Sequence, residues 1–127
     1  MFGHVYHTGY MTDDVARAVA FYEQKFGGQL LKQVSQPDGT KMAFVKFGES
    51  EVELIEPGDK SRLGGKTGLI IDHVGYYVAD LDKAMAELKA KGVKFGAGPT
   101  TSAMGYRMIF VDTDVTLGAR IHLTEEK

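Results

Sequence analysis

The sequence predicts an α+β fold made of two tandem copies of one β-α-β-β-β module, and the repetition itself is the main evidence. Residues 7–10 (His-Thr-Gly-Tyr) and 73–76 (His-Val-Gly-Tyr) read alike, and in each copy an aspartate follows the histidine by seven residues. A second pair of similar segments ends the two copies, with Val-Glu-Leu-Ile-Glu at 52–56 and Ile-His-Leu-Thr-Glu at 121–125. The opening segments, 66 residues apart (73 − 7), and the recurring closing segments together indicate one unit used twice.

The elements of the first copy follow from its periodicities. Residues 3–11 favour a strand, and Asp13-Asp14 supply the polar start of a helix whose apolar residues recur near every 3.6 positions. Gly27-Gly28 ends this helix. Three strands follow at 29–36, 41–47 and 51–56, separated by turn sequences rich in glycine, proline and aspartate.

The second copy repeats this order. A strand is expected at about 70–78 and a helix from Asp80 that stops at Gly92, with Leu81, Ala84, Met85 and Leu88 on the stripe that packs against the sheet. Strands are expected near 93–96, 105–111 and 118–124. We expect one domain over residues 1–127, with module one at 1–57, a connector rich in glycine and charge at 58–69, and module two at 70–127.

Composition excludes several classes of function. The chain has 127 residues, 43% of them hydrophobic, and its 15 basic and 17 acidic residues are well mixed, so no basic stripe suits nucleic acid. No apolar run approaches the roughly 20 residues that span a bilayer. We therefore expect a soluble, cytoplasmic protein that binds neither membranes nor nucleic acid.

The residues suited to chemistry are few, because the chain has no cysteine and only four histidines. Any metal must be held by histidine and carboxylate. Along the strand 51–56, side chains alternate between faces, so Glu53 points away from Val52 and Leu54, and His122 is placed likewise on the strand 118–124. With His7 and His73 on the equivalent first strands, three imidazoles and one carboxylate suit Zn²⁺, Ni²⁺, Co²⁺ or Fe²⁺.

These motifs resemble a known family. The His-x-Gly-Tyr…Asp opening, the helix containing Ala20-Phe21-Tyr22 and the closing segment 52–57, all repeated, are similar to the vicinal oxygen chelate superfamily, closest to its glyoxalase I and methylmalonyl-CoA epimerase branch. The resemblance implies a curved, cup-shaped mixed sheet with helices on its convex side. It also implies one divalent metal ion that holds two adjacent oxygens of a small substrate while a proton shifts through a metal-stabilised enediolate.

The metal ligands of the family map onto His7, Glu53 and His73. The fourth position, a glutamate in the typical glyoxalase I and epimerase, is His122 here. Glu53 is the candidate for a double role as metal ligand and catalytic base. The hairpin position that carries the epimerase base is Pro37, which leaves Asp38 as the nearest carboxylate.

Other functions remain open at this stage. His7, His73 and Glu53 also match the two-histidine, one-carboxylate triad of an Fe²⁺-dependent extradiol-type dioxygenase. A metal-free protein that sequesters a small molecule, like the bleomycin-resistance members, is a third candidate. The family analogy further implies a homodimer.

Overall fold

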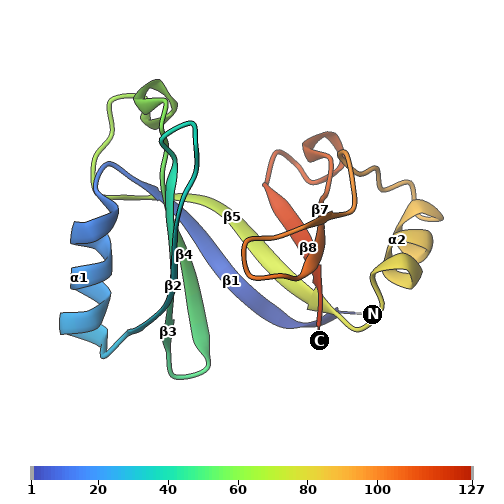
Figure 1. Cartoon of the computed structure of the whole chain (residues 1–127). Coiled ribbons are helices and arrows are strands. Elements are labelled where there is room, and N and C mark those ends of the chain that lie inside the picture. The colour runs from blue at the N-terminus through green and yellow to red at the C-terminus, as the bar shows by residue number, and fades with distance from the viewer. Residues whose placement is uncertain (1, 127) are drawn as a thin grey trace. The chain divides into compact units, whose positions relative to one another are not determined.

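The computed structural model describes residues 2–126, and its elements follow the predicted order twice (Figure 1). The first module contains β1 (Phe2–Thr12), α1 (Val15–Phe26), β2 (Gln29–Ser35), β3 (Lys41–Phe47) and β4 (Ser50–Glu56). A short 3-10 turn, η1 (Lys60–Leu63), lies in the connector. The second module contains β5 (Leu69–Val78), α2 (Leu81–Lys89), β6 (Thr100–Thr101), β7 (Arg107–Phe110), the 3-10 turn η2 (Thr113–Val115) and β8 (Ile121–Glu125). The predicted α+β fold of two β-α-β-β-β modules is confirmed.

The chain divides into two compact units whose boundaries fall inside β1 and β5 rather than in the connector. One unit runs from His7 to Asp72, and the other combines the chain up to Tyr6 with His73 and everything after it. Each unit therefore contains the later part of its own module's first strand and the early part of the other module's first strand. The assignment of residues 1–127 to one domain stays a prediction.

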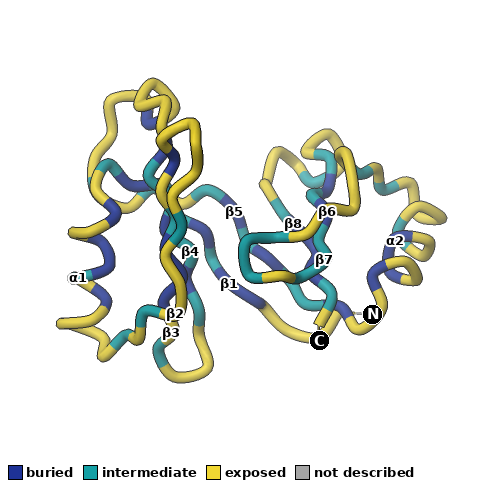
Figure 2. The backbone as a smooth tube through the Cα atoms, viewed as in Figure 1, coloured by how far each residue is buried: buried dark blue, intermediate teal, exposed yellow. Residues whose placement is uncertain are grey.

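The unit from His7 to Asp72 has the strand order β2-β3-β4-β1, with β1 parallel to β4 and the other pairs antiparallel. Helix α1 buries Val15, Ala18, Val19 and Tyr22 against β3 and β4. Figure 2 shows these buried positions along the side of α1 that faces the strands. The apolar stripe predicted for this helix is therefore its packing face, except that Phe26 is 56% exposed.

The second unit repeats this arrangement with the order β5-β8-β7-β6, in which β5 is parallel to β8. Leu81, Ala84 and Met85 of α2 pack with Ile109 and Leu123 of the sheet. Within the described residues, no helix is long and apolar enough to cross a membrane.

Both helices begin in the same way, which explains why the repeat includes its acidic residues. Asp14 and Asp80 each accept a hydrogen bond from the backbone three residues later, at 3.0 Å in both cases. A glutamate from the last strand adds a second acceptor at each helix start: Glu56 for the N–H of Val15 (2.9 Å), and Glu125 for the N–H of Leu81 (2.8 Å). The glutamates of the two closing segments, Glu56 and Glu125, thus anchor the starts of the helices.

Two predicted bounds in the second module are wrong. Residues 93–96 form no strand, and Phe95 makes only an isolated bridge to Val111, because three glycines and a proline between positions 92 and 99 interrupt the ladder. The pairing strand is instead the two-residue β6. Helix α2 ends at Lys89, about one turn before the predicted stop at Gly92.

Candidate metal centre

In the unit from His7 to Asp72, His7 and Glu53 face one another. The parallel pairing of β1 with β4 sets Gly9 opposite Glu53, and His7 lies two residues before Gly9 on the same face of its strand. Because Val52 and Leu54 point into the core under α1, Glu53 must point to the other face. The Nε2 atom of His7 lies 3.8 Å from Oε1 of Glu53, and the side chains are 4% and 14% exposed.

The second unit builds its counterpart from His73 and His122. Gly75 pairs with His122 between β5 and β8, so His73 again lies two residues before the glycine on the shared face. Leu123 lies in the core under α2, which directs His122 to the opposite side. The two imidazole rings have their centres 5.1 Å apart, and both side chains are buried. Each unit therefore presents one first-strand histidine beside one last-strand residue of a type that can bind a metal ion.

Gly75 is the position that makes the second half-site possible. A Cβ atom built on Gly75 would overlap Cε1 and Nε2 of His122, so the imidazole lies directly against the glycine backbone. Any larger residue would push His122 away from His73. The glycine of the His-x-Gly motif is thus explained by the close approach of a ligand side chain.

The environment of His122 keeps its imidazole neutral and oriented. Burial, together with charge repulsion from the neighbouring His73 and Arg120, lowers the pKa of His122 to about 3. Its Nδ1 atom lies 3.0 Å from the hydroxyl of Thr124, two residues along the same face of β8. A hydroxyl beside Nδ1 holds the ring in one orientation.

The donor set and its spacing fit a divalent metal ion. Two imidazoles bound to one tetrahedral ion through a nitrogen each would have their ring centres about 5 Å apart, close to the separation of His73 and His122. A nitrogen and an oxygen on one ion would lie roughly 3.4 Å apart, a few tenths of an ångström less than the 3.8 Å between His7 and Glu53. Neutral imidazoles and a carboxylate suit a zinc-like ion better than magnesium or calcium.

An aromatic ring flanks each half-site. Phe44 on β3 pairs with Glu53, and its ring centre lies 6.4 Å from that of His7. Phe110 on β7 pairs with His122, and its ring centre lies 5.3 Å from His122 and 5.7 Å from His73. The 66-residue offset of the repeat relates these two phenylalanines (44 + 66 = 110), although neither follows from the His-x-Gly motif itself.

Other predicted site residues fall in different places. Asp38 is exposed in the hairpin turn and accepts the backbone N–H of Thr40 at 2.9 Å, which lowers the pKa of its carboxyl group. A carboxylate stabilised in this way is a weak base, so Asp38 is a poor substitute for the missing hairpin base. The guanidinium of Arg120 lies 5.0 Å above the Phe110 ring, beside the second half-site.

The tyrosines separate into two groups. Tyr10 and Tyr76 pack against the two cores. Tyr77 instead lies on the same face as His73, in a cluster with Tyr6 and Tyr106 whose ring centres are 4.6 to 6.0 Å apart. Tyr6 also lies 6.4 Å from His122.

The chain matches known proteins over most of its length. Residues 6–110 match the family described as the glyoxalase/bleomycin resistance protein/dioxygenase superfamily. Mitochondrial methylmalonyl-CoA epimerase of Homo sapiens is 29% identical over 108 residues, which cover 75% of this chain and 61% of the human protein. The chain thus spans about 61% of the length of that relative.

Solved structures share the fold. Methylmalonyl-CoA epimerase from Mycobacterium tuberculosis is 21% identical with a TM-score of 0.87, over 99% of this chain and 89% of that one. A variant of Streptomyces coelicolor methylmalonyl-CoA epimerase, in complex with 2-nitronate-propionyl-CoA, is 24% identical with a TM-score of 0.84, over 99% of both chains. At these identities the likeness establishes the fold alone.

Proposed function

Because the chain belongs to the glyoxalase/bleomycin resistance protein/dioxygenase superfamily, we propose that it is a divalent-metal-dependent isomerase or lyase. Its substrate is a small molecule with two adjacent oxygens and an acidic C–H. One observation carries the proposal: each of the two units sets a buried first-strand histidine beside a last-strand ligand, His7 with Glu53 and His73 with His122.

In the centre that we propose, the two half-sites act together, and His7, Glu53, His73 and His122 hold one divalent ion. Chain connectivity supports this step, because β1 is one continuous strand that contributes to both units. Tyr6 packs near His122 in one unit, and the next residue, His7, faces Glu53 in the other. Zinc, nickel, cobalt and iron(II) all accept such ligands.

In this proposal, Glu53 both binds the metal ion and carries the proton. When bound, the ion supplies a Lewis acid that polarises a substrate carbonyl and makes the neighbouring C–H more acidic. The carboxylate of Glu53 removes that proton and returns it, to the other face in an epimerisation or to the next carbon in a lyase reaction. His122 orients the site without moving protons, since burial keeps its imidazole neutral.

An acyl-CoA thioester with an acidic carbon next to its carbonyl, such as methylmalonyl-CoA, is the first substrate to test. The support is the likeness to methylmalonyl-CoA epimerases, among them one in complex with a propionyl-CoA derivative. A 2-oxoaldehyde adduct of a thiol, the kind of substrate used by lactoylglutathione lyase, is the alternative within the same chemistry.

The test combines metal analysis with isotope exchange. Purified protein should contain one divalent ion per chain, and it should introduce solvent deuterium at the acidic carbon of methylmalonyl-CoA. Glu53→Gln should lower exchange at least about 100-fold, since a positioned general base contributes that much or more. Glu51→Gln, on the same strand, is the matched control and should exchange normally. Absence of exchange with every acyl-CoA and 2-oxo substrate would exclude the proposal.

An extradiol-type dioxygenase remains the second candidate, because the carboxylate of Glu53 lies beside the imidazole of His7, as in an iron(II) triad. Oxygen consumption with catechols by the iron(II)-loaded protein, together with inactivity of the zinc-loaded and nickel-loaded forms, would identify it. A sequestering protein would instead bind its ligand equally well after His73→Ala.

A further inference from the structure

Arg120 is the last residue before β8, and it lies on the same face of its sheet as the imidazoles of the second half-site. The N–H of Val74 donates to the carbonyl of Arg120 at 3.1 Å, so the pairing of β5 with β8 extends back to this residue. His122 follows two positions later, and residues two apart on a strand point to the same face. The guanidinium therefore belongs to the half-site of His73 and His122.

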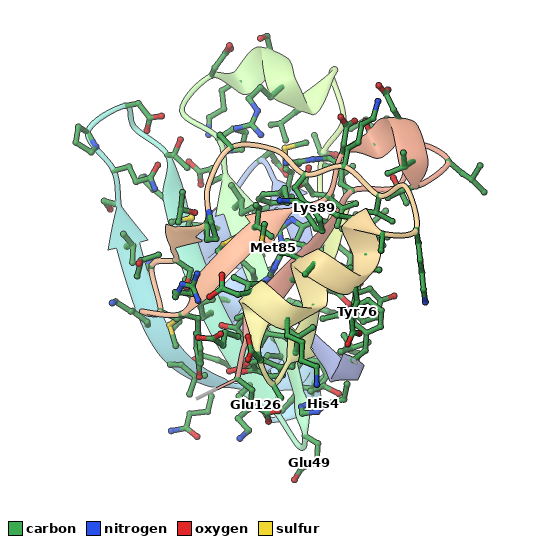
Figure 3. The ribbon with its side chains drawn as sticks, turned by 90° about the vertical axis from the view of Figure 1, so that its right-hand side faces the viewer. His4, Glu49, Tyr76, Met85, Lys89 and Glu126 are labelled. Atoms are coloured by element: carbon green, nitrogen blue, oxygen red, sulfur yellow. The ribbon has the colours of Figure 1, made fainter. Side chains whose placement is uncertain are left out.

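The opposite face of this sheet is the one that packs against α2. Tyr76 of β5 and Ile121 of β8 pack against the core cluster that contains Met85 of α2. Figure 3 views the unit from the side of α2, where Met85 and Tyr76 are labelled. Because Ile121 stands between Arg120 and His122 in the chain, both of these side chains are directed away from the helix.

The ring of Phe110 holds the guanidinium beside the imidazoles. The Cζ atom of Arg120 lies 5.0 Å from the ring centre, within the range of a cation–π contact. The same ring meets both imidazoles at steep angles, 80° to His73 and 66° to His122. A contact with a ring fixes a guanidinium without using its five N–H donors, whose planar arrangement matches the two oxygens of a carboxylate.

The backbone at Arg120 is fixed on both sides. In the loop before it, the hydroxyl of Thr116 donates to the carbonyl of Ala119 at 2.6 Å, and the N–H of Ala119 donates to the carbonyl of Thr116 at 3.2 Å. The hydrogen bond from Val74 holds the carbonyl of Arg120 itself. A residue positioned in this way loses less conformational entropy on binding a ligand than a residue of a mobile loop.

The repeat shows that this cation is specific to the second copy. The closing segments are offset by 69 residues (121 − 52), which relates Arg120 to Glu51 of the first copy. The first half-site also contains a carboxylate among its candidate ligands, Glu53, whereas the second combines two imidazoles with a guanidinium. An anionic group of a ligand is therefore attracted to the second half-site rather than to the first.

We propose that Arg120 is a specificity-determining residue that binds a carboxylate of the substrate. This role rests on the proposed function, because it assigns a further part of the substrate at the same centre. The substrate class is an acyl or 2-oxo compound that carries, besides the two adjacent oxygens that bind the ion, a separate carboxylate in paired hydrogen bonds with the guanidinium. A carboxylate in this place also offsets the repulsion between Arg120 and an ion held by His122.

The first experiment measures the binding of inert chelators to zinc-loaded protein by calorimetry. Hydroxamates present two adjacent oxygens to a metal ion. Succinic acid monohydroxamate ends in a carboxylate, and its terminal amide is the neutral counterpart of the same shape. Wild-type protein should bind the acid at least about ten-fold more tightly, since hydrogen bonds to a charged group contribute that much. Arg120→Gln should abolish this preference, and Arg120→Lys should retain only part of it, because lysine lacks the planar fork.

The matched control is Arg62→Gln, which removes an exposed arginine of the connector and should leave the preference unchanged. Homologues made from malonic and glutaric acid vary the span between the chelating oxygens and the carboxylate. Equal affinity of wild-type protein for acid and amide at all three lengths, or a preference that survives Arg120→Gln, would overturn the proposal. Arg120 is exposed, so its variants should fold, and circular dichroism verifies this.

A second experiment separates the carboxylate site from the metal centre. In metal-free protein, succinate should shift the NMR signals of the Arg120 Nε–H and of the Phe110 ring, whereas neutral succinamide should not. Arg120→Gln should remove the shift of Phe110. If zinc-loaded protein binds no hydroxamate but succinate still produces these shifts, the metal function fails and the carboxylate site stands. If succinate shifts neither signal, or if inorganic phosphate binds more tightly than succinate, the assignment of Arg120 to a carboxylate is wrong.

Discussion

The replacement Gly75→Ala tests the second half-site through a residue that offers no ligand atom. The new Cβ would overlap Cε1 and Nε2 of His122, and the imidazole has little room to retreat. It is 2% exposed, with the rings of His73 and Phe110 centred 5.1 and 5.3 Å away. We therefore expect His122 to turn away from the ion. Loss of a ligand's orientation typically lowers metal affinity 10- to 100-fold, which is about 1.4 to 2.8 kcal/mol.

The assay is a zinc titration against a chromophoric chelator, with circular dichroism to verify folding. Gly96→Ala is the matched control, because a Cβ there meets its nearest atom, the Phe110 carbonyl oxygen, at an ordinary 3.7 Å. In the background of His122→Ala, Gly75→Ala should have no further effect, since the overlapping ring is gone. Wild-type affinity in Gly75→Ala, or equal additional losses in both backgrounds, would refute the close-approach argument.

Three further outcomes are expected. Thr124→Val should lower zinc affinity about 10-fold by removing the hydroxyl next to His122, while Thr124→Ser should retain it, as the same titration will show. Because the pKa of His122 is lowered in the folded state, metal-free protein should lose stability as pH falls below 6.5, the ordinary histidine value. His122→Asn has no imidazole to protonate, so its urea unfolding curves should show a smaller loss of stability over the same pH range. Glu56→Gln should lower the free energy of unfolding by about 1 kcal/mol at pH 7. Because the bonds to Lys60 and to the Val15 N–H lower the pKa of Glu56, this loss should shrink as pH falls below 4.5. The control Glu49→Gln should have little effect at any pH.

The order of the helices and strands could be predicted because the repeat shows the sequence pattern of the same module twice. Strand 41–47 was predicted with its observed bounds, and 29–36 and 51–56 with an error of one residue. The same reliance on symmetry caused the error at 93–96. The second copy has replaced its strand with a segment rich in glycine and proline, and a repeat does not reveal where one copy has changed its backbone.

The placement of His7 beside Glu53 and of His73 beside His122 could be predicted because residue type, strand alternation and the repeat are visible in the sequence, whereas their role as metal ligands stays a prediction. The offset alone could have identified Phe110 from Phe44. The contact between Gly75 and His122 and the bond from Thr124 could not be foreseen, because they depend on side-chain conformation across neighbouring strands. The hydrogen bonds by which Glu56 and Glu125 anchor the helices were missed for a similar reason. The repeat shows that these glutamates recur, but it does not show which backbone groups they reach.

The division of β1 between the two units has a consequence for the order in which the chain folds. The unit from His7 to Asp72 is one unbroken segment, so its contacts can form as soon as that segment leaves the ribosome. The other unit needs residues 2–6 together with the segment from His73 onward, and closing that gap requires ordering the ends of a 66-residue loop. Residues 2–6 therefore meet their partners in this unit, such as Tyr76 and Tyr77, only after synthesis has passed His73.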